Sequence, residues 1–349
     1  MDRRVLLALD YAQERISTGE FEGGWVGGSL TAGLGHPRSD VDVFLLHDEP
    51  SNPPVEQVLR DGVRIDVEYR QIGEITALHA GLAGLTDDPR EGLDDVLSLS
   101  RLDDAARLFY AVPAATGNGP ELIAAVRERE TELRRSRLMR CASIFSSKTE
   151  DVQGAVEAGD PRQQLEISGR LLHEAVEAYT AGAGQYYVGH KWAFTKLEAT
   201  RHHAWLRRRL EDLMFETSLA RAAEITSGRV ALAQQLMGAA FALGWDQPKA
   251  DDWAAYPDAG APEWRADPQW TPIRFGATVL LEGLDKTKHL QMTPLGLLLW
   301  TLAVRLTSTD ACRALVDLAS SGQDPVPEST EVANYLRLLG DRGLLQPIG

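Results

Sequence analysis

The sequence predicts an α+β protein, because patterns typical of strands and patterns typical of helices occupy different parts of the chain. In roughly the first hundred residues, the runs 41–46 and 63–69 are apolar, β-branched or alternating, as strands are. From Pro120 toward Leu243, apolar residues recur at helical spacing. After residue 273, a strand-like run precedes three further helical patterns. The predicted order is a sheet with helices, a helical region and a small mixed segment.

Composition is that of an ordinary globular protein. The chain has 349 residues, of which 44% are hydrophobic and 25% charged, a size at which two or three domains are expected. No apolar run approaches the ~20 residues of a membrane span, and the apolar patch near the N-terminus ends at Asp10, as in a helix rather than a signal peptide. Cys141 and Cys312 lie far apart in the sequence, so we expect no disulfide framework and a cytoplasmic location.

The net charge of −15 argues against a broad basic surface for nucleic acid, since phosphate contacts dominate such binding. We therefore expect neither DNA nor a membrane as a partner, although the net charge does not exclude a local basic patch. Acidity also suits cationic small molecules, but acidity as an aid to solubility is the more general explanation.

The N-terminal elements can be assigned in order. Residues 2–18 have the apolar spacing of an amphipathic helix, and Trp25–Val26 form a short strand. Residues 55–59 are predicted to form a short helix and residues 100–110 a longer one. A linker is expected around Gly117.

Residues 25–46 carry the chemistry-bearing motif. Gly27 and Gly28 can adopt backbone conformations that other residues avoid, and they let the main chain approach a phosphate, to which Ser29 adds a hydroxyl donor. Asp40 and Asp42 precede and enter a buried strand, so they point to the same side. Two adjacent carboxylates repel each other unless a cation lies between them, and Mg²⁺ takes oxygen ligands together with substrate phosphates.

The pattern Gly28-Ser29, ten residues, then Asp40-x-Asp42 resembles the signature of the DNA polymerase β-like nucleotidyltransferase superfamily, which includes antibiotic-modifying enzymes and small antitoxins. That family needs a third carboxylate on a neighbouring strand. Asp66 matches this position, but Glu68 lies on the same face two residues later, so the sequence leaves both open. The resemblance covers roughly the first hundred residues.

The resemblance implies a mixed sheet and transfer of a nucleoside monophosphate from a nucleoside triphosphate, taken to be ATP, to a hydroxyl or similar acceptor, with release of pyrophosphate (EC 2.7.7 type). Asp40, Asp42 and Asp66 would hold two Mg²⁺ ions, and Gly28 and Ser29 would bind the outer phosphates. The acceptor would be a small molecule. The alternative is nucleotidylation of a protein, peptide or RNA.

The same resemblance implies that the helical region closes over the nucleotide and supplies a basic side chain to the triphosphate. Lys191 is the first candidate and Lys196 the second, while a core packing of Trp192 with solvent-reaching lysines is an equal alternative. Glu174 and Glu177 are candidate general bases, between which the sequence does not choose. The arginines within 127–140 are expected on a solvated helix face, because acidic residues lie three and four positions away.

The domain boundaries follow from these features. We predict a nucleotidyltransferase domain over 1–117, a helical domain over 118–244, a Trp- and Pro-rich irregular linker over 245–272 and a winged-helix-like domain over 273–349. In the last, residues 292–296, Trp300 and residues 342–345 resemble the PqqD-like domains that hold leader peptides, which implies a peptide partner. A generic winged helix used for packing is an equal alternative.

Overall fold

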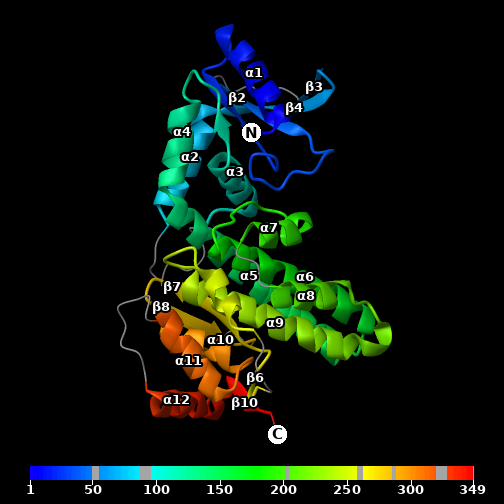
Figure 1. Cartoon of the computed structure of the whole chain (residues 1–349), viewed down its shortest axis with the longest axis vertical. Coiled ribbons are helices and arrows are strands. Elements are labelled where there is room, and N and C mark those ends of the chain that lie inside the picture. The colour runs from blue at the N-terminus through cyan, green and yellow to red at the C-terminus, as the bar shows by residue number, and fades with distance from the viewer. Residues whose placement is uncertain are drawn as a thin grey trace. The chain divides into compact units, whose positions relative to one another are not determined.

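The computed structural model describes residues 1–48, 55–85, 96–200, 204–257, 262–284, 288–319 and 328–348. The chain divides into two compact units (Figure 1). Unit 1 comprises the described residues within 1–86, 94–136 and 186–188, and unit 2 comprises the others. The predicted α+β class is confirmed, since helices accompany a mixed sheet in unit 1 and small antiparallel sheets in unit 2.

Unit 1 is built on a five-stranded sheet with the strand order β3-β4-β2-β1-β5. Its strands are β1 (Gly23–Gly27), β2 (Val41–His47), β3 (Glu56–Arg60), β4 (Val63–Gln71) and β5 (Val112–Pro113). The central strands β2 and β4 are parallel, whereas β1 with β2, β1 with β5 and β3 with β4 are antiparallel. The sheet is therefore mixed.

The helix α1 (Arg3–Ser17) covers one face of this sheet, and Figure 1 shows it beside β2 and β4. Its side chains Val5, Ala8 and Ala12 form a core with Val41 and Val43 and further apolar residues of β2 and β4. Successive strand residues point to opposite faces. Because Val41 and Val43 face α1, Asp42 and Phe44 lie on the other face.

The helices α2 (Ile72–Ala83), α3 (Leu99–Phe109) and α4 (Gly119–Glu128) complete unit 1, and α4 packs against both α2 and α3. The predicted helix over 100–110 is confirmed by α3. The short helix predicted over 55–59 is wrong. This segment contains β3, which pairs residue by residue with β4 from Glu56 opposite Val67 to Arg60 opposite Val63. Backbone bonds to a distant strand outweigh the weak local preference of so short a segment.

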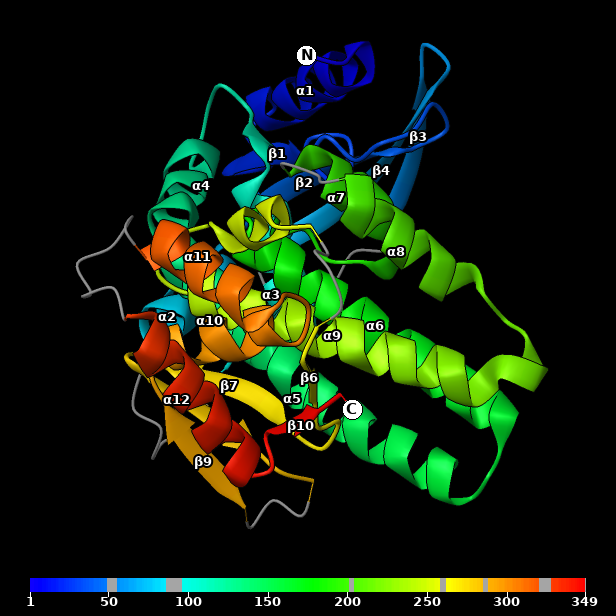
Figure 2. The same ribbon diagram turned by 60° about the horizontal axis from the view of Figure 1, so that its bottom comes forward.

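Unit 2 contains a group of long helices. These are α5 (Glu130–Glu157, within unit 2 from Arg137 onward), α6 (Pro161–Gly182), α7 (Ala193–Ala199), α8 (Ala204–Phe215) and α9 (Ala222–Leu243), with the short 3₁₀ helices η1 (His190–Trp192) and η2 (Leu219–Arg221). α6 and α9 lie side by side, as Figure 2 shows. The helical pattern that begins near Pro120 is divided at Arg129, between α4 and α5.

The expectation that the arginines of 127–140 all line a solvated face is wrong for two of them. Arg134 and Arg137 are each only 2% exposed. Arg137 donates to Glu177 at 2.7 Å, and Arg134 donates to the hydroxyl of Tyr186 at 3.3 Å. A buried guanidinium needs such partners, which residues distant in the sequence provide here.

The C-terminal part of unit 2 begins with η3 (Ala250–Ala255) and β6 (Trp264–Ala266). Trp245 and Trp253 are fully buried, so this segment adds to the core. The strands β7 (Thr271–Phe275), β8 (Thr278–Glu282) and β9 (His289–Met292) form a second sheet. They are followed by α10 (Pro294–Ala303), α11 (Ser308–Ala319), α12 (Ser329–Asp341) and β10 (Leu345–Pro347), which pairs with β6. Among the described residues, no helix is both long and apolar enough to cross a membrane.

Candidate functional site

Three aspartates meet where β2 begins. Asp40 directly precedes β2, Asp42 is its second residue, and Asp66 lies on β4. The parallel register pairs Asp42 with Asp66, so their side chains share a face. One carboxylate oxygen from each of the three residues lies within 4.8 Å of the others. The structure thus brings together the three acidic residues that the sequence singled out.

The choice between Asp66 and Glu68 is decided by this register. Glu68 lies opposite Phe44, one step farther along the same face. Its carboxylate accepts a hydrogen bond from Nη2 of Arg70 at 2.9 Å and lies 3.8 Å from Nη1 of Arg107. Glu68 is thus neutralised by arginines, whereas Asp66 belongs to the acidic cluster.

The electrostatics of the cluster are unfavourable for three free carboxylates. Burial raises the pKa of Asp42 to about 6; Arg107 opposes this effect, and the charges of Asp40, Glu68 and Asp66 add to it. Burial and the charge of Asp40 also raise the pKa of Asp66. Burial acts to raise the pKa of Asp40 as well, but the hydrogen bond and charge of Arg64 outweigh it and lower that pKa. The site as a whole favours an added positive charge.

Two local features fit a cation at this place. The Oδ1 atom of Asp66 is buried and accepts no hydrogen bond from the described residues. The Nε atom of Arg64 lies 3.7 Å from it. Gly28 has a φ of +88°, and a Cβ atom there would lie 2.1 Å from Oδ2 of Asp42. A glycine therefore keeps the space beside the Asp42 carboxylate open. Three carboxylates form an oxygen donor set suited to a hard ion such as Mg²⁺.

The chain after Gly28 forms a compact turn. The amide of Ala32 donates to the carbonyl of Gly28 at 3.3 Å, and the amide of Leu34 donates to that of Ser29 at 2.8 Å. Ser29 is half-buried and directly follows the residue that touches Asp42. Gly28 and Ser29 therefore lie beside the acidic cluster, as their spacing in the sequence suggests.

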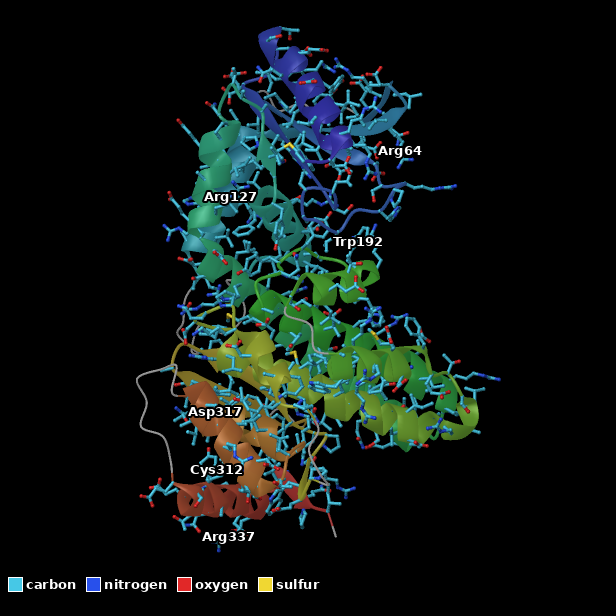
Figure 3. All side chains as sticks on the ribbon, viewed as in Figure 1. Arg64, Arg127, Trp192, Cys312, Asp317 and Arg337 are labelled. Atoms are coloured by element: carbon cyan, nitrogen blue, oxygen red, sulfur yellow. The ribbon has the colours of Figure 1, made fainter. Side chains whose placement is uncertain are left out.

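Three further residues around the cluster were missed by sequence reasoning. Arg64, labelled in Figure 3, extends from β4 and forms a hydrogen-bonded ion pair with Asp40. Arg64 lies two residues before Asp66 on the same strand, and this spacing indicates that both side chains are on one face of the sheet. Arg107 of α3 influences the pKa of Asp42, and Tyr187 lies close enough to Asp42 and Asp40 for their charges to raise its pKa. Burial is the main reason that the Tyr187 pKa rises to about 12. No local pattern indicates either of these residues, because both come from distant segments.

The two candidate lysines belong to unit 2. Lys191 is exposed, and its Nζ lies 5.0 Å from the ring centroid of the buried Trp192. Lys196 is 0% exposed and forms an ion pair with the buried carboxylate of Glu177. The carboxylate oxygen Oε1 of Glu174 lies 3.0 Å from Nε2 of His190. Lys196 and Glu177 thus neutralise each other inside unit 2, whereas Lys191 is accessible to a ligand.

No model of a known protein family matches the sequence, and no curated protein matches it. The solved structure of a nucleotidyltransferase-like protein from Exiguobacterium sibiricum 255-15 aligns with 69% of this chain and 76% of its own length. The sequence identity is 14% and the TM-score 0.39. So low a similarity carries no argument about activity, which therefore has to be inferred from the side chains of the site.

Proposed function

We propose that this protein is a nucleotidyltransferase that moves a nucleoside monophosphate from a nucleoside triphosphate, ATP in the first instance, to a hydroxyl on a small molecule. The observation that supports the proposal is the cluster of Asp40, Asp42 and Asp66 beside the glycine turn at Gly28. An acidic cluster that favours an added cation, next to a turn that lets a phosphate approach the main chain, suits phosphoryl chemistry.

In this proposal Asp40, Asp42 and Asp66 would hold two Mg²⁺ ions. When bound, the ions supply charge neutralisation at the α-phosphate and lower the pKa of the attacking hydroxyl. The hydroxyl oxygen forms the new bond to the α-phosphorus. The bond to the bridging oxygen breaks, its electron pair leaves with pyrophosphate, and the hydroxyl proton passes to solvent.

The chain's own groups orient the triphosphate. The amide of Gly28 and the hydroxyl of Ser29 donate to its outer phosphates. For the basic side chain, Lys191 stays the candidate that the sequence predicts, because a lysine ammonium is a compact positive charge. Arg107 stabilises the ionised form of Asp42, which an ion requires as its ligand. We do not assign Lys196 to the phosphates, because its charge is already neutralised by Glu177.

A second candidate is transfer to a peptide or protein. It is favoured by a cavity of about 290 Å³ in unit 2, lined by Leu295, Leu299, Leu315, Val332 and Tyr335 among others, which offers an apolar surface between α10 and α12. Incubation with ATP labelled at the α-phosphate distinguishes the two, because label in a macromolecular fraction supports the second candidate and label in a small product supports the first.

The decisive variant is Asp42→Asn, which keeps the shape of the side chain and removes its charge. We expect pyrophosphate release to fall at least ~100-fold, the scale of a lost transition-state contact. We also expect Mn²⁺ binding, followed by electron paramagnetic resonance, to weaken. Asp48→Asn is the matched control, because Asp48 is an exposed carboxylate just beyond the other end of β2. Near-normal pyrophosphate release in Asp42→Asn contradicts the proposal.

A further inference from the structure

Unit 1 contains a cavity of about 460 Å³ on the same face of the sheet as the acidic cluster. Its lining includes Trp25 and Phe44 from the sheet, Arg70 at the end of β4, and Arg101, Asp104 and Arg107 from α3. The rings of Trp25 and Phe44 are stacked, with their centroids 5.4 Å apart. The cavity therefore has an aromatic floor and several charged groups in its walls.

This cavity lies one step along the strands from the acidic cluster. Phe44 follows Asp42 by two residues on β2 and points to the same face, which places it ~7 Å farther along the strand. Arg107 lines the cavity and also influences the pKa of Asp42. A molecule of the size of a sugar in this cavity could extend a hydroxyl to the cluster, as a nucleotide acceptor must.

The lining is rich in hydrogen-bond donors. Each guanidinium carries five N–H donors and no acceptor. Among the described residues, Arg70 directs one nitrogen, Nη2, to both Glu68 and Asp104, at 2.9 and 3.1 Å. Arg107 donates through Nε to Asp103 at 3.0 Å. Glu68 and Asp103 do not line the cavity, so they neutralise these arginines from outside it.

The two carboxylates of the lining are already engaged. Asp104 accepts from Arg70, and Glu74 accepts from the amide of Gln71 at 3.3 Å, where it caps the start of α2. Three guanidinium groups thus face a cavity whose own acidic side chains have partners. The guanidinium N–H groups that these partners leave unused are donors for the oxygen atoms of a ligand, and a phosphate or carboxylate oxygen forms the strongest of these hydrogen bonds.

An unsatisfied buried donor supports the same conclusion independently. Trp25 is 3% exposed, and its indole Nε1–H has no acceptor among the described residues. Burying an N–H without a partner is unfavourable, so an oxygen atom supplied by a ligand would recover that cost. Trp25 lines this cavity, where a ligand oxygen can provide the acceptor.

We propose that this cavity is the acceptor site and that it selects a hydroxylated acceptor carrying a phosphate or carboxylate group, held by Arg70, Arg101, Arg107 and the Trp25 indole. This inference rests on the proposed nucleotidyl transfer and narrows its substrate class.

The test measures binding to the full chain by calorimetry in metal-free buffer, where the nucleotide chemistry plays no part. The probes are ribose 5-phosphate, its carboxylate counterpart ribonate, neutral ribose and the polycation kanamycin. We expect at least one anionic probe to bind at least ~10-fold more tightly than ribose and kanamycin, as charge-assisted hydrogen bonds require. Whether ribose 5-phosphate or ribonate binds more tightly identifies the anionic group.

Two variants locate the binding. Arg101→Gln removes one guanidinium at the cavity, and Trp25→Phe removes the indole N–H while keeping an aromatic ring. Each should weaken binding of the anionic probe, whereas Arg60→Gln, an arginine on β3 that pairs with Glu14, should leave it unchanged. Circular dichroism checks that each variant is folded.

The inference is overturned if neither anionic probe binds or if kanamycin binds best. It is also overturned if Arg101→Gln and Trp25→Phe both bind the anionic probe as tightly as the wild type does. The proposed function fails separately, through normal pyrophosphate release by Asp42→Asn. Nucleotide transfer to kanamycin would refute the proposed anionic acceptor and would support the proposed nucleotidyltransferase activity.

Discussion

Two clusters of charged side chains, one in each unit, differ in how far their carboxylates are neutralised by cationic side chains. In unit 1, Arg64, whose side chain is half-exposed, pairs with Asp40 and lies 3.7 Å from Asp66, while the charge of Arg107 acts on Asp42. In unit 2, the carboxylate of Glu177 accepts from Nη2 of Arg137 at 2.7 Å and also from Nζ of Lys196, and all three side chains are at most 4% exposed. The first cluster has an excess of negative charge, and the second is internally neutralised.

The pKa values show the consequence. Burial raises the pKa of Asp42, and neighbouring carboxylates add to this effect. Burial acts in the same direction on Glu177, but Lys196 and Arg137 outweigh it and lower the pKa of that carboxyl. Partners, and not burial alone, therefore decide whether a buried acid is stable when ionised. This difference separates a site arranged for an external cation from a cluster that joins α5, α6 and α7.

The largest effect on stability is expected from Glu177→Gln. This change leaves Arg137 and Lys196 buried without their counter-charge, so the free energy of unfolding should fall by ~3–5 kcal/mol. Asp42→Asn should not lower it, because it removes a carboxylate that its acidic neighbours already disfavour. Urea denaturation followed by circular dichroism measures both. Equal losses of unfolding free energy in the two variants would contradict the proposed difference between the clusters.

A smaller effect, on metal binding, is expected from Gly28→Ala. Its new methyl group would collide with Oδ2 of Asp42, so Mn²⁺ affinity should fall at least ~10-fold, as when groups that orient a metal ligand are disturbed. Gly33→Ala is the matched control, because Gly33 also has a positive φ, +73°, but a Cβ atom there meets nothing within 4 Å. If both variants lose the same affinity, backbone strain is the cause.

Arg64→Gln should change metal affinity in the opposite direction. Arg64 is the chain's own cation on Asp40, so its removal should tighten Mn²⁺ binding by about three- to tenfold, a Coulomb effect reduced by solvent screening. Calorimetric titration measures the affinity, with Arg60→Gln as the control. Weaker binding in Arg64→Gln would mean that Arg64 supports the carboxylates instead of competing for them.

The smallest effect concerns His190 in unit 2. Its hydrogen bond to Glu174 raises the pKa of His190, while burial opposes the shift; the stacked His173 has a pKa lowered by burial. A histidine with a raised pKa stabilises the fold below its unfolded pKa of about 6.5, and this contribution is lost as the pH rises through the folded pKa. Wild type should therefore lose more thermal stability than His190→Gln between pH 5.5 and 8.5. Parallel melting-temperature curves would refute this.

Several features of the site follow from the sequence alone. Strand alternation places Asp40 and Asp42 on one side of β2 and Asp66 on one side of β4, and the glycine pair indicates a close approach of the main chain. The helix over 100–110 and the three C-terminal helices also follow from local periodicity, because each is long enough for one apolar face to be evident.

The three-dimensional contacts were needed to identify the acid that completes the cluster, since the choice between Asp66 and Glu68 depends on the register of two parallel strands. They also decided that residues 56–60 form a strand, that Arg137 and Lys196 are buried together, and that Arg107 and Tyr187 lie near Asp42. The physical reason is common to all of these. Local spacing determines the face of an element on which a side chain lies, whereas its partners and burial depend on contacts between residues far apart in the chain.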